Sequence, residues 1–196
     1  MIARDRAARP EAKPLRLFVA LDVPAGVRDL VEEAVSPIRE RYPRARWVPK
    51  QNQHVTLKFL GSTWPRLVGW VGESIESVTR ASERFTSRVS AVGAFPAPRR
   101  ARVLWAGLED AGGRITALAT ALDDALGREF QPEKRAFTPH LTVARFDPPV
   151  GLEEELRAVS SLAGEPFAVE GLVLYRSHLQ RPAPIYEALG EFRLGG

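Results

Sequence analysis

Residues 54–60, HVTLKFL, decide the fold, because their pattern of His, apolar residue, Thr and apolar residue returns once at residues 140–145, HLTVAR. In both stretches apolar side chains alternate with other side chains, which is the pattern of a β-strand with one buried face. A turn and then a helical pattern follow each copy. This repetition predicts two similar lobes.

The side chains at positions i and i+2 of a strand point to the same face, so His54 lies with Thr56, and His140 lies with Thr142. If the two lobes face each other, two imidazoles and two hydroxyls line one cleft. A neutral histidine can accept a proton from water, and a protonated histidine can donate one to a leaving oxygen. The hydroxyls can bind phosphate oxygens that gain charge in the transition state. These groups are suited to cleaving a phosphodiester.

Two basic residues follow the repeated motifs. Lys58 lies four positions after His54, on the same face by alternation, and Arg145 lies three positions after Thr142. Both are predicted to supply positive charge to the site. The third histidine, His178, lies in a polar segment without a matching threonine, and we expect it to lie on the surface.

The order of strands and helices predicts the fold class. Apolar periodicity predicts strands at 15–21, 54–60, 85–92, 102–108, 140–145, 167–175 and 185–194, with a short one near 47–48. It predicts helices that begin near 24, 67, 114 and 152, and a turn at 147–150. Strands grouped around crossing helices indicate an α+β fold rather than a doubly wound sheet.

The composition indicates a soluble protein with one bilobal domain at 15–196. Of the 196 residues, 44% are hydrophobic and 27% are charged, which is usual for a globular domain. No apolar run approaches the ~18 residues of a membrane-spanning helix. Residues 1–14 are rich in Arg, Ala and Pro and lack the apolar core of a secretory signal, so we expect a disordered tail.

Several chemistries have no support in the sequence. The chain has no cysteine, which excludes thiolate nucleophiles and cysteine-ligated metals and fits a reducing, cytoplasmic location. Neither histidine of the repeated motif has a flanking carboxylate, and no His-Glu-x-x-His, Gly-x-Ser-x-Gly or phosphate-binding Gly-x-x-x-x-Gly-Lys motif is present. We therefore expect no metal and no cofactor.

The charge of the chain bears on its partners. The net charge is +4, and only four of the 28 basic residues are lysines. Arginine matches phosphate geometry, so this favours a phosphorylated or nucleic-acid partner. A genome of high GC content would enrich arginine in the same way, and the composition does not separate these two explanations.

Five segments carry a resemblance to a known family. They are LRLFVALDVP (15–24), RWVPKQNQHVTLKFLG (46–61), FPAPRRARVLWAGL (95–108), FTPHLTVARF (137–146) and LVLYRSHLQRPAPIYEAL (172–189). In content and order they resemble the two-histidine phosphoesterases. Within these, the chain is most similar to the bacterial and archaeal RNA 2′,3′-cyclic phosphodiesterases, also called 2′-5′ RNA ligases.

This resemblance implies a bilobal fold with pseudo-twofold symmetry and a catalytic cleft between two antiparallel sheets flanked by helices. It implies metal-independent opening of a 2′,3′-cyclic phosphate at an RNA end, which leaves a 2′-phosphate. It assigns catalysis to His54, Thr56, His140 and Thr142, and phosphate binding to Arg145. The family picture has His140 activating water and His54 protonating O3′, which the sequence alone does not decide.

Further contacts with the substrate are expected around these motifs. Phe59 stands where the second motif has Arg145, so the motif arginine is present once. Phe18 lies off the apolar stripe of its strand and either stacks on a base or belongs to the core. Arg135 precedes the second motif and is expected to line the same cleft.

Other functions remain open at this stage. The same site run in reverse would join RNA ends through a 2′-5′ linkage. The substrate could also be a small cyclic nucleotide, or the chain could bind RNA ends with little turnover, which the intact pair of histidines disfavours. We expect a monomer that acts on RNA ends, including tRNA fragments, with no membrane partner.

Overall fold

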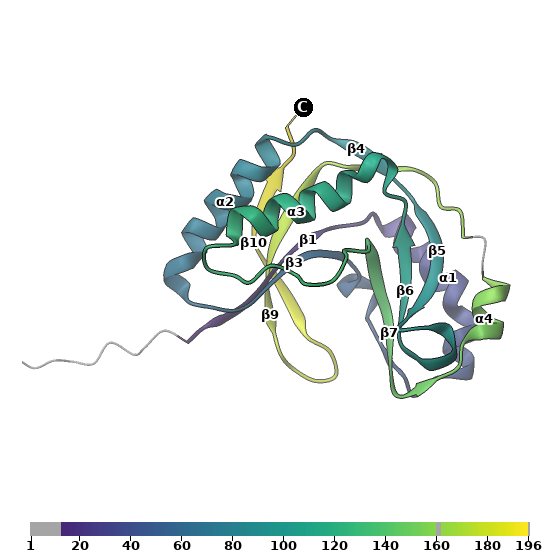
Figure 1. Cartoon of the computed structure of the whole chain (residues 1–196). Coiled ribbons are helices and arrows are strands. Elements are labelled where there is room, and N and C mark those ends of the chain that lie inside the picture. The colour runs from purple at the N-terminus through teal and green to yellow at the C-terminus, as the bar shows by residue number, and fades with distance from the viewer. Residues whose placement is uncertain (1–12, 160–161, 196) are drawn as a thin grey trace, which may run out of the picture.

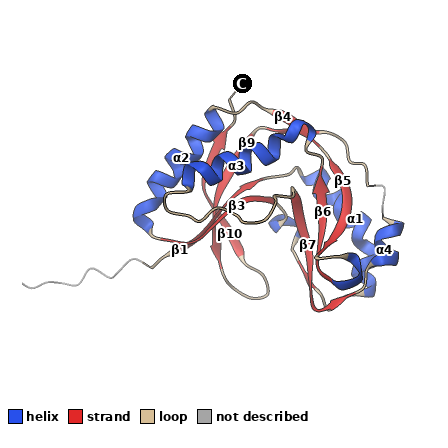
Figure 2. Cartoon of the chain, in the orientation of Figure 1, coloured by secondary structure: helices blue, strands red, loops and turns tan. Residues whose placement is uncertain are grey.

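The computed structural model describes residues 13–159 and 162–195. The strands are β1 (Leu15–Leu21), β2 (Arg46–Trp47), β3 (Val55–Thr63), β4 (Phe85–Ser87), β5 (Val89–Phe95), β6 (Ala101–Leu108), β7 (His140–Val150), β8 (Phe167–Val169), β9 (Gly171–His178) and β10 (Ile185–Arg193). The α-helices are α1 (Ala25–Arg41), α2 (Val68–Arg80), α3 (Arg114–Leu126) and α4 (Glu153–Ala158). Figure 2 shows the helices at the outer sides of the strands, with α2 and α3 above β1 and β3 and with α1 and α4 beyond β5.

One antiparallel sheet organises the molecule, in the order β10-β9-β1-β3-β7-β6-β5, with β2 beside β7. Its two halves join at β3 and β7, where a single residue pair, Val55 with Leu141, forms the register. In Figure 1, α2 and α3 lie over the half that contains β1, β3, β9 and β10, whereas α1 and α4 lie beside the other half. The predicted α+β fold is confirmed, and the two expected antiparallel sheets are the two halves of this one sheet.

The helices form because each presents one apolar stripe to a sheet. In α1, Val27, Val31, Val35 and Ile38 recur every three or four residues and are all buried. Burying a side chain of this size contributes roughly 1.5–3 kcal/mol. The stripe therefore supplies a large share of what holds α1 against its half of the sheet.

Some expected boundaries are wrong. The expected turn at 147–150 belongs to β7, because Val150 still pairs with Ala101 of β6 and proline tolerates extended backbone. The expected strand 85–92 is divided into β4 and the start of β5, and the expected strand 167–175 into β8 and the start of β9. The short strands β4 and β8 pair with each other as a separate small sheet. The helix expected to begin near 152 is short and extends from Glu153 to Ala158.

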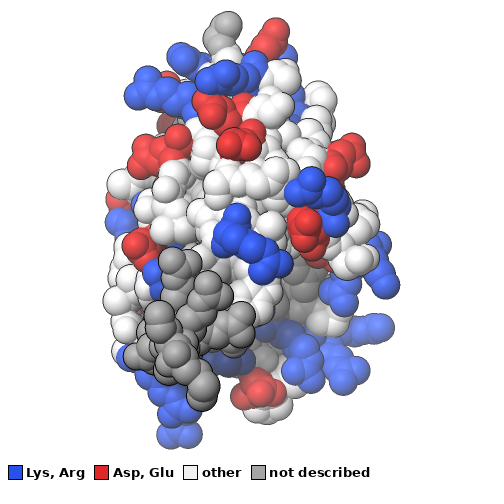
Figure 3. Space-filling model, turned by 90° about the vertical axis from the view of Figure 1, so that its left-hand side faces the viewer, with Lys and Arg blue, Asp and Glu red and all other residues white. Residues whose placement is uncertain are grey.

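Residues 1–12 of the expected tail, and residues 160–161, lie outside the described residues. No helix in the described part is long and apolar enough to cross a membrane. Lys and Arg side chains gather at the lower edge of the face in Figure 3, whereas its upper part mixes both charges.

Candidate active site

The junction between the halves places the two motifs side by side. Val55 and Leu141 form the only register pair between β3 and β7 among the described residues, and both side chains are fully buried. The residues on either side of each therefore point to the opposite face of the sheet. These neighbours are His54, Thr56, His140 and Thr142. We call this surface the His–Thr face; its register sets each histidine across from the threonine of the other motif.

Each motif strand contains a β-bulge just after its threonine. Leu57 of β3 is skipped in the register with β1, and Val143 of β7 is skipped in the register with β6. A bulge moves the residues beyond it to the opposite face. Phe59 and Arg145, five positions after their histidines, are thereby returned to the His–Thr face. The pseudo-symmetry of the motifs thus extends to a shared irregularity of the backbone.

The bulge also explains why the expectation for Lys58 is wrong. Lys58 is turned to the helix side of the sheet, where it is 4% exposed. Its ammonium group donates to the Asp123 carboxylate of α3 and, over 2.7 Å, to the carbonyl oxygen of Gln131. Lys58 therefore joins α3 to β3 and does not contact the His–Thr face.

We expect Lys58→Ala to lower the free energy of unfolding by roughly 3 kcal/mol, because Asp123 would lose its buried partner. Turnover by the folded protein should change little. Urea unfolding followed by circular dichroism, with activity measured on the same samples, checks this. If Lys58→Ala leaves the free energy of unfolding unchanged but abolishes turnover, Lys58 acts in the active site after all.

Backbone carbonyls fix the tautomer of both histidines. His54 Nδ1 lies 2.8 Å from the Asn52 carbonyl oxygen, and His140 Nδ1 lies 2.6 Å from that of Thr138. A carbonyl only accepts, so Nδ1 carries the proton and Nε2 of each neutral ring is left as a base. His54 Nε2 is 3.0 Å from Oγ1 of Thr56, whose hydroxyl can donate to it.

Both imidazoles favour the neutral form. Burial lowers the pKa of His54 to about 4, although the Asn52 carbonyl and the Asp22 carboxylate oppose the change. Burial also lowers the pKa of His140, and the nearby charge of Arg145 lowers it further. A bound phosphate anion would raise the pKa of each ring. The substrate-free site therefore holds two neutral bases at neutral pH.

Aromatic rings support His54 on one side. Phe18 stacks on the imidazole with centroids 4.8 Å apart and on Tyr175 with centroids 5.3 Å apart. Tyr186 meets the edge of the imidazole at 5.3 Å. Because Phe18 is 3% exposed and covered by these rings, it belongs to the core, the second of its two expected places. Phe18 instead forms the wall behind His54.

A second aromatic pair supports His140. Its ring lies 5.2 Å from Phe95 and 6.2 Å from Trp105, measured between centroids. The indole of Trp105 covers Gly93 so closely that a Cβ there would lie 2.3 Å from it. Glycine at this position therefore lets the indole lie flat on β5. Each motif histidine thus stands among large rings contributed by its own half.

The remaining predicted residues fall into different places. Arg145 is exposed and close enough to His140 and Tyr186 to affect the pKa of both groups. Arg135 is exposed in the segment between α3 and β7, and its side chain forms no hydrogen bond or ion pair among the described residues. His178 ends β9 and bonds Glu187 at 2.7 Å, so it lies at the surface as expected.

Sequence reasoning missed residues that approach the site from distant segments. Asp22, which follows β1, accepts a 2.8 Å hydrogen bond from the Tyr175 hydroxyl of β9. The Asn52 side chain donates to the Pro184 carbonyl oxygen over 2.7 Å. The tyrosines lie in predicted strands, and alternation alone could have marked Tyr175 as facing away from the apolar stripe. Asn52 carries no comparable signal.

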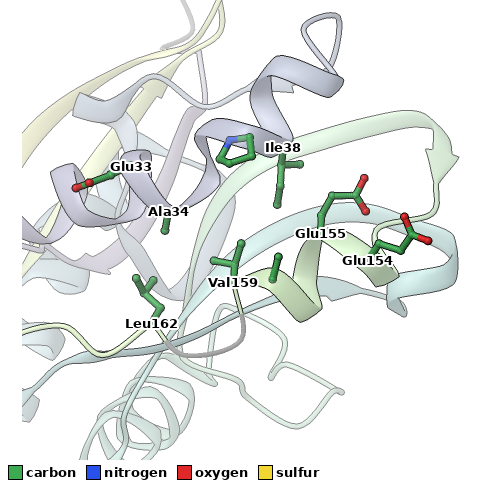
Figure 4. Close-up of a pocket in the computed structure, with 9 residues that line it drawn as sticks. Glu33, Ala34, Ile38, Glu154, Glu155, Val159 and Leu162 are labelled. Atoms are coloured by element: carbon green, nitrogen blue, oxygen red, sulfur yellow. The ribbon is translucent and has the colours of Figure 1, made fainter.

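The structure also contains a groove of about 550 Å³ between α1 and α4. Figure 4 shows Ala34, Ile38, Val159 and Leu162 lining it, with carboxylates at its edges. It shares no residue with the His–Thr face.

Comparisons with known proteins agree with this geometry. The model of the 2′-5′ RNA ligase superfamily matches residues 27–181. The RNA 2′,3′-cyclic phosphodiesterase of Methanothermobacter thermautotrophicus is 30% identical over 184 residues, which cover 92% of this chain and 99% of that protein.

Solved structures agree as well. TT0787 of Thermus thermophilus is 29% identical with a TM-score of 0.75, over 93% of this chain and 99% of that one. Escherichia coli LigT complexed with 3′-AMP is 26% identical with a TM-score of 0.70, over 92% and 98%. With the paired His–Thr motifs on one face of the shared fold, these matches show that the chain belongs to the 2′-5′ RNA ligase superfamily.

Proposed function

We propose that this protein is an RNA 2′,3′-cyclic phosphodiesterase that hydrolyses a terminal 2′,3′-cyclic phosphate to a 2′-phosphate. The observation that carries the proposal is the pair of His–Thr motifs set across one residue pair on one face of the sheet. The relatives with this name support the same reaction.

The reaction needs one proton acceptor and one proton donor. In the proposed mechanism, Nε2 of His140 takes a proton from water, whose oxygen attacks phosphorus opposite O3′. The P–O3′ bond breaks, and protonated His54 gives its proton to O3′, so the 2′-phosphate remains. Thr56 and Thr142 bind the non-bridging oxygens through their hydroxyls, and Arg145 neutralises their charge.

The donor role requires that His54 be protonated when substrate is bound. Its pKa of about 4 in the free protein works against this, because the neutral form then prevails at neutral pH. The effect of the Asp22 carboxylate is already present in the free protein, so it is the phosphate anion of the substrate that favours the imidazolium and raises that pKa. We therefore propose that His54 becomes protonated, and so able to donate, when the substrate binds.

The experiment that tests the function compares turnover of a dinucleotide and a longer RNA, each ending in a 2′,3′-cyclic phosphate. We expect hydrolysis of both, with a higher kcat/KM for RNA if the chain acts on RNA ends. Binding of RNA ends without hydrolysis would contradict the proposal. A kcat/KM for the dinucleotide equal to or higher than that for the RNA would indicate that the substrate is a small cyclic nucleotide rather than an RNA end.

The same experiment examines the reverse reaction. An RNA with a free 5′-hydroxyl, added to the cyclic-phosphate RNA, would give a 2′-5′ joined product if that hydroxyl replaces water as the nucleophile, with O3′ again leaving and taking the proton from His54. Because water is far more concentrated than RNA ends, hydrolysis should dominate.

We propose that a monomer is sufficient for the reaction, since the described residues of both motifs come from one copy of the chain.

We expect hydrolysis to continue in EDTA at an unchanged rate, because imidazoles perform both proton transfers. The described residues contain no group of three or more His, Cys, Asp or Glu side chains placed to hold a metal. Initial rates before and after dialysis against EDTA check this. A loss of rate that zinc or magnesium restores would contradict the mechanism.

A further inference from the structure

A pocket of about 490 Å³ opens beside His54, in the size range of small-molecule sites. It lies between the turn at 49–53 and the loop at 179–184 that joins β9 to β10, with Asp22 and Tyr175 at one side. The Asn52 side chain holds turn and loop together through its 2.7 Å bond to the Pro184 carbonyl oxygen. Two walls of the pocket are therefore joined by a defined hydrogen bond.

The lining of the pocket is unsuited to phosphate. Its polar side chains are the amides of Gln51, Asn52, Gln53 and Gln180, the hydroxyls of Tyr175 and Tyr186, the imidazole of His54 and the carboxylate of Asp22. It contains no Lys or Arg, and its charged group is an anion. Apolar rings and side chains, including Pro182, Ile185 and Tyr186, form the rest. A flat, uncharged, hydrogen-bonding group fits this chemistry.

Asp22 determines which hydrogen-bonding atoms a ligand in this pocket must present. Its Oδ2 accepts the Tyr175 hydroxyl at 2.8 Å, and no partner for Oδ1 is seen among the described residues. A carboxylate accepts hydrogen bonds and does not donate them. A ligand facing Oδ1 must therefore present an N–H or O–H group. A carbonyl oxygen placed there would meet like charge.

Nucleobases differ in this respect. Adenine and cytosine carry an exocyclic amino group on the edge where uracil has a carbonyl oxygen, and guanine carries its amino group on another position. Uracil also carries an N–H group, at N3, but a carbonyl oxygen lies on each side of it and would meet the carboxylate. Cytosine and uracil have the same size, so the preference between them reports this contact.

We propose that this pocket holds the base of the nucleoside that bears the cyclic phosphate, and that Asp22 selects bases with an amino group. The inference rests on the proposed function, which places the phosphate beside His54. Asp22 thereby acts as a specificity-determining residue, with the phosphate outside the pocket on the His–Thr face.

The test measures kcat/KM for cytidine and uridine 2′,3′-cyclic monophosphates. We expect the wild type to prefer cytidine by roughly tenfold, because uridine can offer Asp22 only its N3–H, between two carbonyl oxygens that the carboxylate repels. In Asp22→Asn the preference should fall to within about threefold, since an amide can both donate and accept. The amide oxygen can still accept from Tyr175, so the variant keeps that contact. Asp124→Asn, an exposed change on α3, is the matched control and should retain the wild-type ratio.

A binding measurement separates this inference from the function itself. In His140→Ala, titration calorimetry with 2′-CMP and 2′-UMP should show the same preference, which Asp22→Asn should remove from that background. Equal affinities, or a ratio that Asp22→Asn leaves unchanged, would overturn the role of Asp22. Absence of hydrolysis with intact base preference would refute the proposed function and retain the pocket as a nucleotide site.

Discussion

Replacing His54 or His140 with alanine is expected to lower kcat by ~10²–10⁴-fold, because each ring transfers one of the two protons. The double variant should be little slower than either single variant, since the two groups serve one step and their effects are not additive. Initial rates on a cyclic-phosphate dinucleotide, measured at saturating substrate, check both statements.

The fold should persist in all three variants, because each ring points away from the buried Val55–Leu141 pair. Circular dichroism and thermal unfolding provide this control. A folded alanine variant with near wild-type turnover would show that the paired motifs are only structural.

The pH profile of the wild type follows from the same pair. One ring must be neutral and the other protonated, so kcat/KM should give a bell-shaped curve. Because the free protein lowers the pKa of both rings below 6.5, that bell should be centred on the acidic side of pH 6.5. The curve for kcat should lie at higher pH, since bound phosphate raises both values. Each single variant should lose one limb, which identifies the base and the acid.

Arg145→Ala is expected to lower kcat/KM by roughly tenfold to a hundredfold, because the β-bulge at Val143 brings its guanidinium to the His–Thr face. Arg145→Lys should recover only part of the loss, since an ammonium group lacks the two-pronged geometry. Steady-state kinetics on the dinucleotide measure both.

Arg80→Ala is the matched control, because Arg80 is an exposed partner of Glu76 on α2, away from the motifs. It should keep wild-type kinetics. If Arg145→Ala behaves like this control, Arg145 does not bind the phosphate.

Alternation within two short strands was enough to predict the centre of the candidate site. His54 and Thr56, and likewise His140 and Thr142, share a face because period two holds from the histidine to the threonine. The prediction for Lys58 was wrong because the alternation of side chains between the two faces of the strand is interrupted at Leu57. Leu57 resembles any other apolar strand residue, and the bulge arises from pairing with β1, which is a contact distant in sequence.

The surroundings of His54 show the same limit. Phe18 and Tyr175 stack because β1 pairs with β9, more than 150 positions further along the chain. No local pattern reports that register, so the sequence left open whether Phe18 belongs to the wall or to the substrate site. The turn expected at 147–150 was wrong for a related reason, because pairing with β6 overrides the preference of two prolines for a turn.

In the proposed reaction, water opens a 2′,3′-cyclic phosphate by displacing O3′. The most direct measurement is hydrolysis of an RNA with a 2′,3′-cyclic phosphate end in ¹⁸O-labelled water, with the product examined by mass spectrometry and phosphorus NMR. We expect one ¹⁸O atom in a 2′-phosphate, with a free 3′-hydroxyl. A 3′-phosphate product, or no labelled phosphate from the folded protein, would contradict it.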